Sequence, residues 1–307
     1  MRRAKKEKQK AKHPVLDWVE AFVWAAGMVL LANQYLVQAY VIPSGSMIDT
    51  LLIGDRVFVN KLVYGPELLP GIAKLPSVFK PARNDIIIFE NPTYISKGPV
   101  FDIAQRIIFM LTISLVDIDR DENGQPLAHF LIKRAVGMGG DRFVVERGEM
   151  KVLFAGDDRW TDERGYAQQR GWGHNITRLM DEKQYPTLEM LGRALGWEDL
   201  RLPVPERLRA VAVAVQARGG INNADNLAYR KARLETIRSA LPHDRRIAEE
   251  LARQSLGRYV PEGRVLPLGD NRDSSNDGRN FGPVRVTKVL GKGLIIFWPF
   301  KRIGTIR

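Results

Sequence analysis

The hydrophobic pattern near the start of the chain predicts one membrane-spanning helix. No charged residue occurs between Glu20 and Asp49, and residues 21–42 carry only three strongly polar side chains, Asn33, Gln34 and Gln38. A helix of that length rises about 33 Å, roughly the thickness of the hydrocarbon core of a bilayer. We therefore expect a transmembrane helix over residues 15–42.

Two other interpretations of this segment are weaker. A cleavable signal peptide has a shorter apolar region that ends in a small-residue cleavage site, whereas Pro43 follows this run without a convincing cleavage pattern. A buried core helix is disfavoured because residues 1–14 form a basic tail, with seven Lys and Arg against one Glu. Basic segments stay in the cytoplasm, so we expect the tail there and everything after Pro43 on the far side of the membrane.

Beyond the apolar run, β-branched and apolar stretches bounded by turn residues predict strands. They cover residues 51–62, 85–90, 128–138, 264–270 and 292–300, with a hairpin over residues 141–155. Residues 102–118 are also apolar, but their uncharged run is too short to span a bilayer comfortably. We expect a buried or membrane-surface element there, and a second membrane span is the alternative.

A helical pattern interrupts the strands. Residues 205–217, 224–241 and 243–256 each have caps or helix breakers at their ends. The simplest fold class is mainly β: a body of antiparallel sheet with one N-terminal transmembrane helix and an inserted helical subdomain. The body would comprise residues 43–155 and 259–307, and the insertion residues 156–258. The insertion could bind a partner, bind a substrate or only decorate the fold.

Composition narrows the function classes. The net charge is +12, but half of it lies in the basic tail, so the body is weakly basic and we expect no nucleic-acid partner. The chain has no cysteine, which excludes disulfides, thiolate metal sites and cysteine nucleophiles. With 45% hydrophobic and 27% charged residues, a packed core is expected rather than disorder.

Three segments carry candidate chemistry: PSGSM at residues 43–47, IKRAVGMGGD at 132–141 and GDNRDSSNDGRNFG at 269–282. A serine hydroxyl is a poor nucleophile until a nearby base takes its proton. Among the four histidines, His129 is the one plausible base, because the others lie in the tail or in the insertion. Lys133 is the alternative, since on a strand it would share an apolar face with its second neighbours, and burial lowers the pKa of an amine.

Together these segments closely resemble the type I signal peptidases, the membrane-bound Ser/Lys proteases also called leader peptidases. PSGSM just beyond a membrane anchor, with TLLIGD behind it, resembles the nucleophile box of that family. RNDIIIF at 83–89 and the other two segments resemble its remaining boxes in order. The resemblance covers residues 21–61, 83–92, 130–146 and 264–300. It departs from the family pattern at Asp49, at Gly139-Gly140 and at Asn84, where the family usually has proline, proline-glycine and glycine.

The resemblance implies a serine endopeptidase that removes signal peptides from exported preproteins at the outer face of a bacterial cytoplasmic membrane. Ser46 would be the nucleophile and Lys133 the general base. The backbone N–H of Ser46 and the hydroxyl of Ser44 would hold the oxyanion. Ser275 would hydrogen-bond the Lys133 amine and orient it.

The resemblance also implies supporting residues and partners. Asp270 would pair with Arg134, and Asp277 with Arg279. Shallow apolar pockets for small substrate side chains would be lined by Ile42, Met47, Leu51, Ile88 and Ile132. The expected partners are signal-peptide-bearing preproteins, the lipid bilayer and an unknown partner of the insertion; no cofactor or metal is implied.

Three alternatives remain beside this interpretation. A membrane-anchored scaffold with a vestigial Ser/Lys pair would fit the charge at Asp49 and the large insertion. A self-cleaving repressor shares related chemistry, but those proteins are soluble and the membrane anchor argues against one. A β-lactamase-like Ser-x-x-Lys arrangement fails, because the third residue after Ser46 is Asp49.

Overall fold

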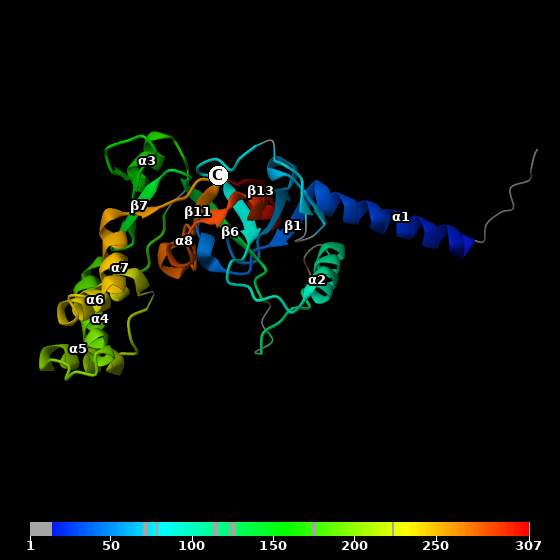
Figure 1. The fold of residues 1–307 in the computed structure, drawn as a ribbon. Coiled ribbons are helices and arrows are strands. Elements are labelled where there is room, and N and C mark those ends of the chain that lie inside the picture. The colour runs from blue at the N-terminus through cyan, green and yellow to red at the C-terminus, as the bar shows by residue number, and fades with distance from the viewer. Residues whose placement is uncertain are drawn as a thin grey trace, which may run out of the picture.

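An eight-stranded antiparallel sheet forms the centre of the molecule (Figure 1). The computed structural model describes residues 14–69, 73–77, 79–112, 116–122, 124, 127–173, 176–222 and 224–306, so residues 1–13 of the expected basic tail lie outside the described residues. The strand order is β1-β2-β13-β5-β6-β11-β12, and β14 pairs with β13. The bounds are β1 Val37–Val41, β2 Arg56–Asn60, β5 Ile86–Glu90, β6 Phe130–Met138, β11 Arg264–Leu268, β12 Val284–Arg285, β13 Val289–Trp298 and β14 Gly304–Thr305.

Two smaller sheets complete the β structure. One has the order β10-β7-β8-β9 and contains the hairpin expected over residues 141–155; the other pairs β3 with β4. Their bounds are β7 Arg142–Glu146, β8 Glu149–Leu153, β9 Thr161–Asp162, β10 Arg258–Tyr259, β3 Glu67–Leu69 and β4 Ala73–Lys74. The predicted fold class, mainly β with an N-terminal apolar helix and several further helices, is therefore confirmed.

The N-terminal helix is shorter than the sequence predicts. Helix α1 spans Pro14–Tyr35, and its part from Val15 onward is long and apolar enough to cross a membrane. The helix ends at Tyr35 rather than at residue 42, because Val37–Val41 form a strand that pairs antiparallel with β2. Uncharged apolar residues suit either a membrane helix or a buried strand, and the available partner strand decides between them here.

Helix α2, Pro99–Leu111, occupies most of the region that the sequence marks as a buried or membrane-surface element. Its 13 residues are too few to span a bilayer. Within the described part of the chain, α1 is the one helix that meets the length and hydropathy needed to cross a membrane. The alternative of a second span at 102–118 is therefore not supported.

The expected insertion is helical and lies at the end of the molecule remote from α1 (Figure 1). Its helices are α3 Glu163–Gln169, α4 Tyr185–Asp199, α5 Glu206–Ala217, α6 Asn226–Ala240 and α7 Arg245–Leu256. Helices α4 and α6 pack closely at two glycines of α4: a Cβ would come within 2.3 Å of the Tyr229 carbonyl oxygen at Gly192, and within 2.8 Å of the Arg233 carbonyl oxygen at Gly196. These glycines let the two helix backbones approach each other.

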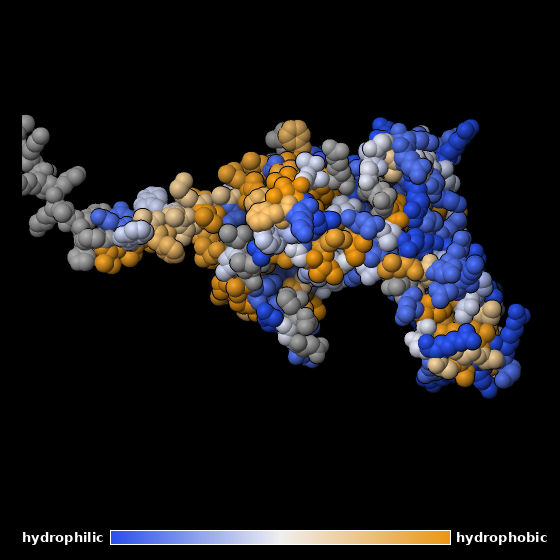
Figure 2. Space-filling view, turned by 180° about the vertical axis from the view of Figure 1, so that it is seen from behind, coloured by the Kyte–Doolittle hydropathy of each residue, from blue (hydrophilic) through white to orange (hydrophobic). Residues whose placement is uncertain are grey.

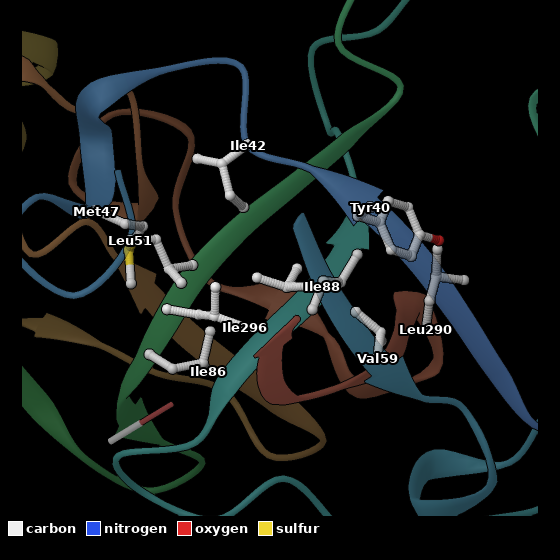
Figure 3. Close-up of a cluster of buried hydrophobic side chains, with 10 residues drawn as sticks. Tyr40, Ile42, Met47, Leu51, Val59, Ile86, Ile88, Leu290 and Ile296 are labelled. Atoms are coloured by element: carbon white, nitrogen blue, oxygen red, sulfur yellow. The ribbon is translucent and has the colours of Figure 1, made fainter. Parts of the chain in front are cut away.

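The main hydrophobic core lies on one face of the large sheet (Figure 3). It joins residues from β1, the turn after β1, β2, β5 and β13, namely Tyr40, Ile42, Met47, Leu51, Val57, Val59, Ile86, Ile88, Leu290 and Ile296. Because this cluster packs directly beneath the PSGSM turn, it fixes the position of that turn relative to the strands.

A buried polar cluster joins α1 to the body of the molecule. The Lys61 ammonium donates to Gln38 Oε1 at 3.1 Å and to the Asn33 carbonyl oxygen at 3.5 Å. The Gln34 side chain donates to the carbonyl oxygen of Glu67. The Glu67 carboxylate accepts a hydrogen bond from Arg106 of α2. Burial lowers the pKa of Lys61 to about 8, although the nearby Glu67 carboxylate acts in the opposite direction and raises it.

Candidate active site

The turn after β1 presents Ser46 to the face of β6. Residues Gly45–Met47 form a single 3₁₀ turn in which Ser46 and Met47 are buried. Asn271 holds this turn, because its backbone N–H donates to the carbonyl oxygen of Ser46 at 3.1 Å and its side-chain amide donates to that of Gly45 at 3.0 Å. The Ser44 hydroxyl lies 3.4 Å from Ser46 Oγ. The two serines of the motif therefore lie side by side.

Lys133 of β6 contacts Ser46. Its ammonium lies 2.6 Å from Ser46 Oγ and 3.0 Å from the carbonyl oxygen of Ile132. Lys133 is 3% exposed. Burial lowers its pKa to about 8, although the Asp277 and Asp270 carboxylates raise it. An amine with this pKa has a substantial neutral fraction near pH 8, and its lone pair can then accept the serine proton.

His129, the alternative base, is engaged elsewhere. Its Nε2 lies 2.7 Å from Asp119 Oδ2, and its ring packs on Tyr94 with centroids 4.1 Å apart. The structure thus brings Ser46 together with Lys133 and places His129 in a separate polar contact. His129 and Lys133 are only four residues apart in the sequence, so the sequence left both as candidate bases. The contact with Ser46 distinguishes them.

Arg134, the next residue on β6, points to the opposite face and forms the expected pair with Asp270. Its guanidinium donates to Asp270 Oδ1 at 2.9 Å and to Oδ2 at 2.7 Å, and both side chains are 1% exposed. The Thr50 hydroxyl joins the same carboxylate. Asn84, where the family has glycine, adopts a left-handed φ of 76° and accepts from Arg134 at 2.7 Å. The buried charges of Arg134 and Asp270 are tolerated because each forms hydrogen bonds to the other and to neighbouring polar groups.

The expected pair between Asp277 and Arg279 is also present, with Arg279 Nε donating to Asp277 Oδ1 at 2.9 Å. Burial alone would raise the pKa of Asp277, but Arg279 and two backbone N–H groups hold it below its ordinary value. One of these is the Gly269 N–H, which donates to Asp277 Oδ2 at 3.0 Å. Asp277 therefore stays charged, and its hydrogen bonds to Gly269 and Arg279 join the two ends of the loop that follows β11.

The expected hydrogen bond between Ser275 and Lys133 is absent from this structure, so the role of Ser275 stays a prediction. Ser275 Oγ is buried without a hydrogen-bond partner among the described residues. Lys133 instead uses Ser46 and the backbone of Ile132. Gly269 explains how close the loop comes: a Cβ there would lie 2.2 Å from Ser275 Oγ and 2.6 Å from the Ser46 carbonyl oxygen. Ser275 therefore lies beside the Ser46 turn without a hydrogen bond to the Lys133 amine.

Ile42, Met47, Leu51 and Ile88, four of the five expected pocket residues, lie in the main core cluster (Figure 3). These four are 0–3% exposed, and the partly buried Ile132 packs against the same cluster. With so little open surface these residues are part of the main core beside the Ser46 turn, and their contact with substrate side chains stays a prediction. A cavity of about 500 Å³ lies between β7 and helices α6 and α7, and neither Ser46 nor Lys133 lines it.

The insertion reaches the site, a contact that the sequence did not reveal. The Thr177 N–H donates to the carbonyl oxygen of Asp270 at 2.8 Å, and the Arg272 N–H donates to that of Thr177 at 3.0 Å. Thr177 Oγ1 also donates to Asp49 Oδ2 at 3.3 Å. The carboxylate of Glu163 forms a bidentate, buried pair with Arg272. These contacts join residues 156–258 to the loop that holds the Ser46 turn.

Sequence reasoning missed other residues of the site. Asn271 and Thr50 lie inside the recognised motifs, so the sequence indicated that they lie near the site, but it did not indicate which groups they contact. Thr177 and Glu163 carry no local signal, because they lie about a hundred residues before their partners. Within the described ranges, no group of three His, Asp or Glu side chains is placed to hold a metal ion.

A serine hydroxyl against a buried amine, on an antiparallel β body, is the geometry expected of a serine peptidase. A family model described as "Signal peptidase, peptidase S26" matches residues 15–191 and 209–298. The chain therefore belongs to the signal peptidase family, peptidase S26, and is a hydrolase that acts on preproteins with signal peptides. The resemblance stated from the motifs is confirmed.

Named relatives agree with the family. The chain is 37% identical over 319 residues to signal peptidase I of Pseudomonas fluorescens, covering 96% of this chain and 81% of that protein. It is 25% identical over 278 residues to signal peptidase I of Aquifex aeolicus, covering 89% and 80%. It is 26% identical over 304 residues to signal peptidase I of Haemophilus influenzae, covering 96% and 74%. The similarity extends along most of the chain.

Proposed function

We propose that the chain is a membrane-anchored serine endopeptidase that removes signal peptides with Ser46 as nucleophile and Lys133 as general base. The observation that carries this proposal is the 2.6 Å contact between the Lys133 ammonium nitrogen and Ser46 Oγ in a buried setting. Burial supplies a fraction of neutral amine, and contact places its lone pair within reach of the serine proton.

The reaction proceeds in two halves. Neutral Lys133 takes the proton of Ser46 as Oγ bonds to the scissile carbonyl carbon, and the carbonyl electron pair moves to its oxygen. The tetrahedral intermediate collapses, the C–N bond breaks, and Lys133 gives its proton to the leaving amine of the mature protein. A water molecule, deprotonated by Lys133, then attacks the ester, and the proton returns to Ser46 as the signal peptide leaves with a carboxylate.

The oxyanion of each intermediate would be held by the Ser46 N–H and the Ser44 hydroxyl. The Ser44 hydroxyl is exposed and close to Ser46 Oγ, which supports this role because a small rotation would turn its donor toward the substrate oxygen. Preference for small substrate side chains follows from packing. The cluster of Ile42, Met47 and Leu51 leaves little free space beside Ser46, so only a short side chain could enter without displacing them.

Helix α1 would hold this site at the membrane. It is apolar and exposed, with Phe22, Trp24 and Met28 all 69–75% exposed. Such surface on a single helix is costly in water and favourable in lipid. The basic tail would remain in the cytoplasm and the body would lie outside, as expected of a single-pass protein of a bacterial cytoplasmic membrane. The named relatives, all bacterial signal peptidase I proteins, support this placement.

The test is cleavage of a preprotein with a small-x-small site by the full chain purified in detergent. Ser46→Ala and Lys133→Met should each lower kcat/KM at least about 1000-fold, the scale of losing a nucleophile or its base. Lys61→Met is the matched control, because Lys61 is equally buried and has the same lowered pKa; it should change kcat/KM less than about threefold.

Each contrary result has its own meaning. If Lys133→Met cleaves as well as the unchanged chain, the dyad is wrong and His129 becomes the base to test. If the folded, unchanged chain cleaves nothing, the scaffold interpretation replaces the enzymatic one.

A further inference from the structure

Helix α2 has the reverse of the usual amphipathic arrangement. Its polar side chains turn toward the protein: Gln105 donates to Asp117 at 2.9 Å, and Arg106 pairs with Glu67 and Glu90 at 3.3 and 3.5 Å. Gln105 is 1% exposed. A helix on the surface of a soluble protein places such side chains in water and its apolar side chains inside.

The outward face of α2 is an apolar stripe. Val100 is 82% exposed, and Ile103, Ile107 and Leu111 are 37%, 40% and 43% exposed. Their spacings of three, four and four residues place all four side chains on one side of the helix. We call these four residues the α2 stripe. A contiguous apolar stripe of this kind indicates a surface that meets an apolar environment.

Helix α2 adjoins α1. The two helices pack against each other, and α2 lies beside the end of α1 that meets the body, running across the direction of α1 (Figure 1). Figure 2 shows apolar side chains gathered along α1 and on the adjoining end of the body, whereas the insertion end is mainly hydrophilic. If α1 crosses a bilayer, the bilayer surface meets the molecule at the level of α2.

The position of α2 is fixed from inside. Phe109 packs against the main core with its ring 6.2 Å from that of Tyr40, and the Arg106 side chain lies over the Phe130 ring. With these contacts and the two ion pairs of Arg106, α2 cannot turn its apolar stripe inward without breaking buried interactions. The stripe therefore stays directed outward.

We propose that α2 is an interfacial helix whose stripe lies in the outer leaflet of the bilayer that α1 spans. This rests on the membrane anchoring proposed above. Helices that lie in the interface bury one apolar face among headgroups and acyl chains. A single spanning helix leaves the body free to rotate about its axis, whereas a second contact beside it fixes one face of the body toward the membrane. The α2 contact would thus set the orientation of the Ser46 turn relative to signal peptides held in the same bilayer.

The test uses fluorescent labels on the full chain reconstituted in phospholipid nanodiscs. Because the chain has no cysteine, one environment-sensitive label can be attached at each of three single-cysteine variants: Ile107→Cys on the stripe, Val23→Cys on α1, and Val213→Cys on α5. Val213 is the matched control, an apolar residue that is 61% exposed on the remote insertion. Each label is quenched in turn by spin-labelled phospholipid and by aqueous iodide.

We expect the Ile107 label to be quenched by the spin-labelled lipid, and its iodide quenching constant to be at least about threefold lower than that of the Val213 label, as for a residue buried in the interface. The Val23 label should be lipid-quenched in the same sample. Lipid quenching at Val23 with full iodide quenching at Ile107 would overturn the α2 proposal and leave the anchor intact. Protection of Ile107 from both quenchers would overturn it in favour of a protein partner or a second copy. Iodide quenching at both positions would overturn the anchor and the α2 proposal together.

Discussion

Lys61 and Lys133 are two buried lysines with the same lowered pKa and different surroundings. They are 2% and 3% exposed, and burial lowers the pKa of each to about 8. Lys61 donates to an amide oxygen and a backbone carbonyl, neither of which has a proton to give up. Lys133 contacts the hydroxyl of Ser46. Burial thus prepares an amine to act as a base, and only its neighbour determines whether there is a proton to take.

The charges around the two lysines also differ. Glu67 of β3 and Arg106 of α2, which lie near Lys61, are paired with each other. Asp270 and Asp277, which lie near Lys133, are each paired with an arginine. Because their arginines neutralise these carboxylates, neither forms a direct salt bridge that would keep Lys133 protonated. The ion pairs near the site therefore surround Lys133 without forming a salt bridge to it.

The largest expected effect comes from breaking one of these ion pairs. Asp270→Asn would leave the buried Arg134 guanidinium without its counter-charge, so we expect the free energy of unfolding to fall by about 3–5 kcal/mol. Urea unfolding of the full chain in detergent measures this. Glu146→Gln is the control, since its pair with Lys151 is exposed on both sides and should contribute under about 1 kcal/mol. A loss at Asp270→Asn no larger than the control would show that the pair does not hold β6 to the last motif.

The part of the site that could be predicted from the sequence is the part that lies within motifs. Ser46, Lys133 and the arginine–aspartate pairs stand in recognisable segments, and the structure brings each pair together. The β-branched runs likewise predicted the central strands, because hydrophobic patterning is local information. What the motifs could not supply is the side-chain contact itself, as Ser275 shows: it lies in the right loop, but Lys133 hydrogen-bonds elsewhere.

The features that could not be predicted from the sequence arise from long-range contacts. Val37–Val41 continues the uncharged run of α1 and becomes a strand only because β2 is available to pair with it. Met47 and Leu51 lie in the nucleophile motif, but their burial depends on four strands and a turn that converge on them. Lys61 gives no sign of burial in the sequence, since its environment is assembled from α1, β1 and β3. Pairings of this kind depend on topology rather than on neighbouring residues.

A pH profile of the peptidase reaction sharpens the comparison between the two lysines. Below a pKa of about 8, Lys133 is protonated and cannot accept the serine proton, so kcat/KM should fall about tenfold per pH unit as the pH drops below 8 and level off above it. Lys61→Met should leave both the position and the slope of this limb unchanged. If the limb moved in Lys61→Met, activity would depend on the wrong lysine, and the distinction drawn from their neighbours would fail.

The smallest expected effect tests how the insertion contacts the surroundings of Lys133. Thr177 joins the last motif through two backbone hydrogen bonds, and its side chain adds a long, exposed bond to Asp49. Thr177→Val removes only the hydroxyl, so kcat/KM should change less than about twofold, because an exposed hydrogen bond exchanges readily with water.

Thr177→Pro removes the N–H that donates to the Asp270 carbonyl oxygen, and should lower kcat/KM at least about tenfold by loosening the loop that holds the Ser46 turn. Assays of both variants on the same preprotein separate the two contacts. Equal activities would mean that the backbone bridge does not reach the chemistry, whereas a large loss in Thr177→Val alone would make Asp49, the residue that replaces the usual proline, part of the working site.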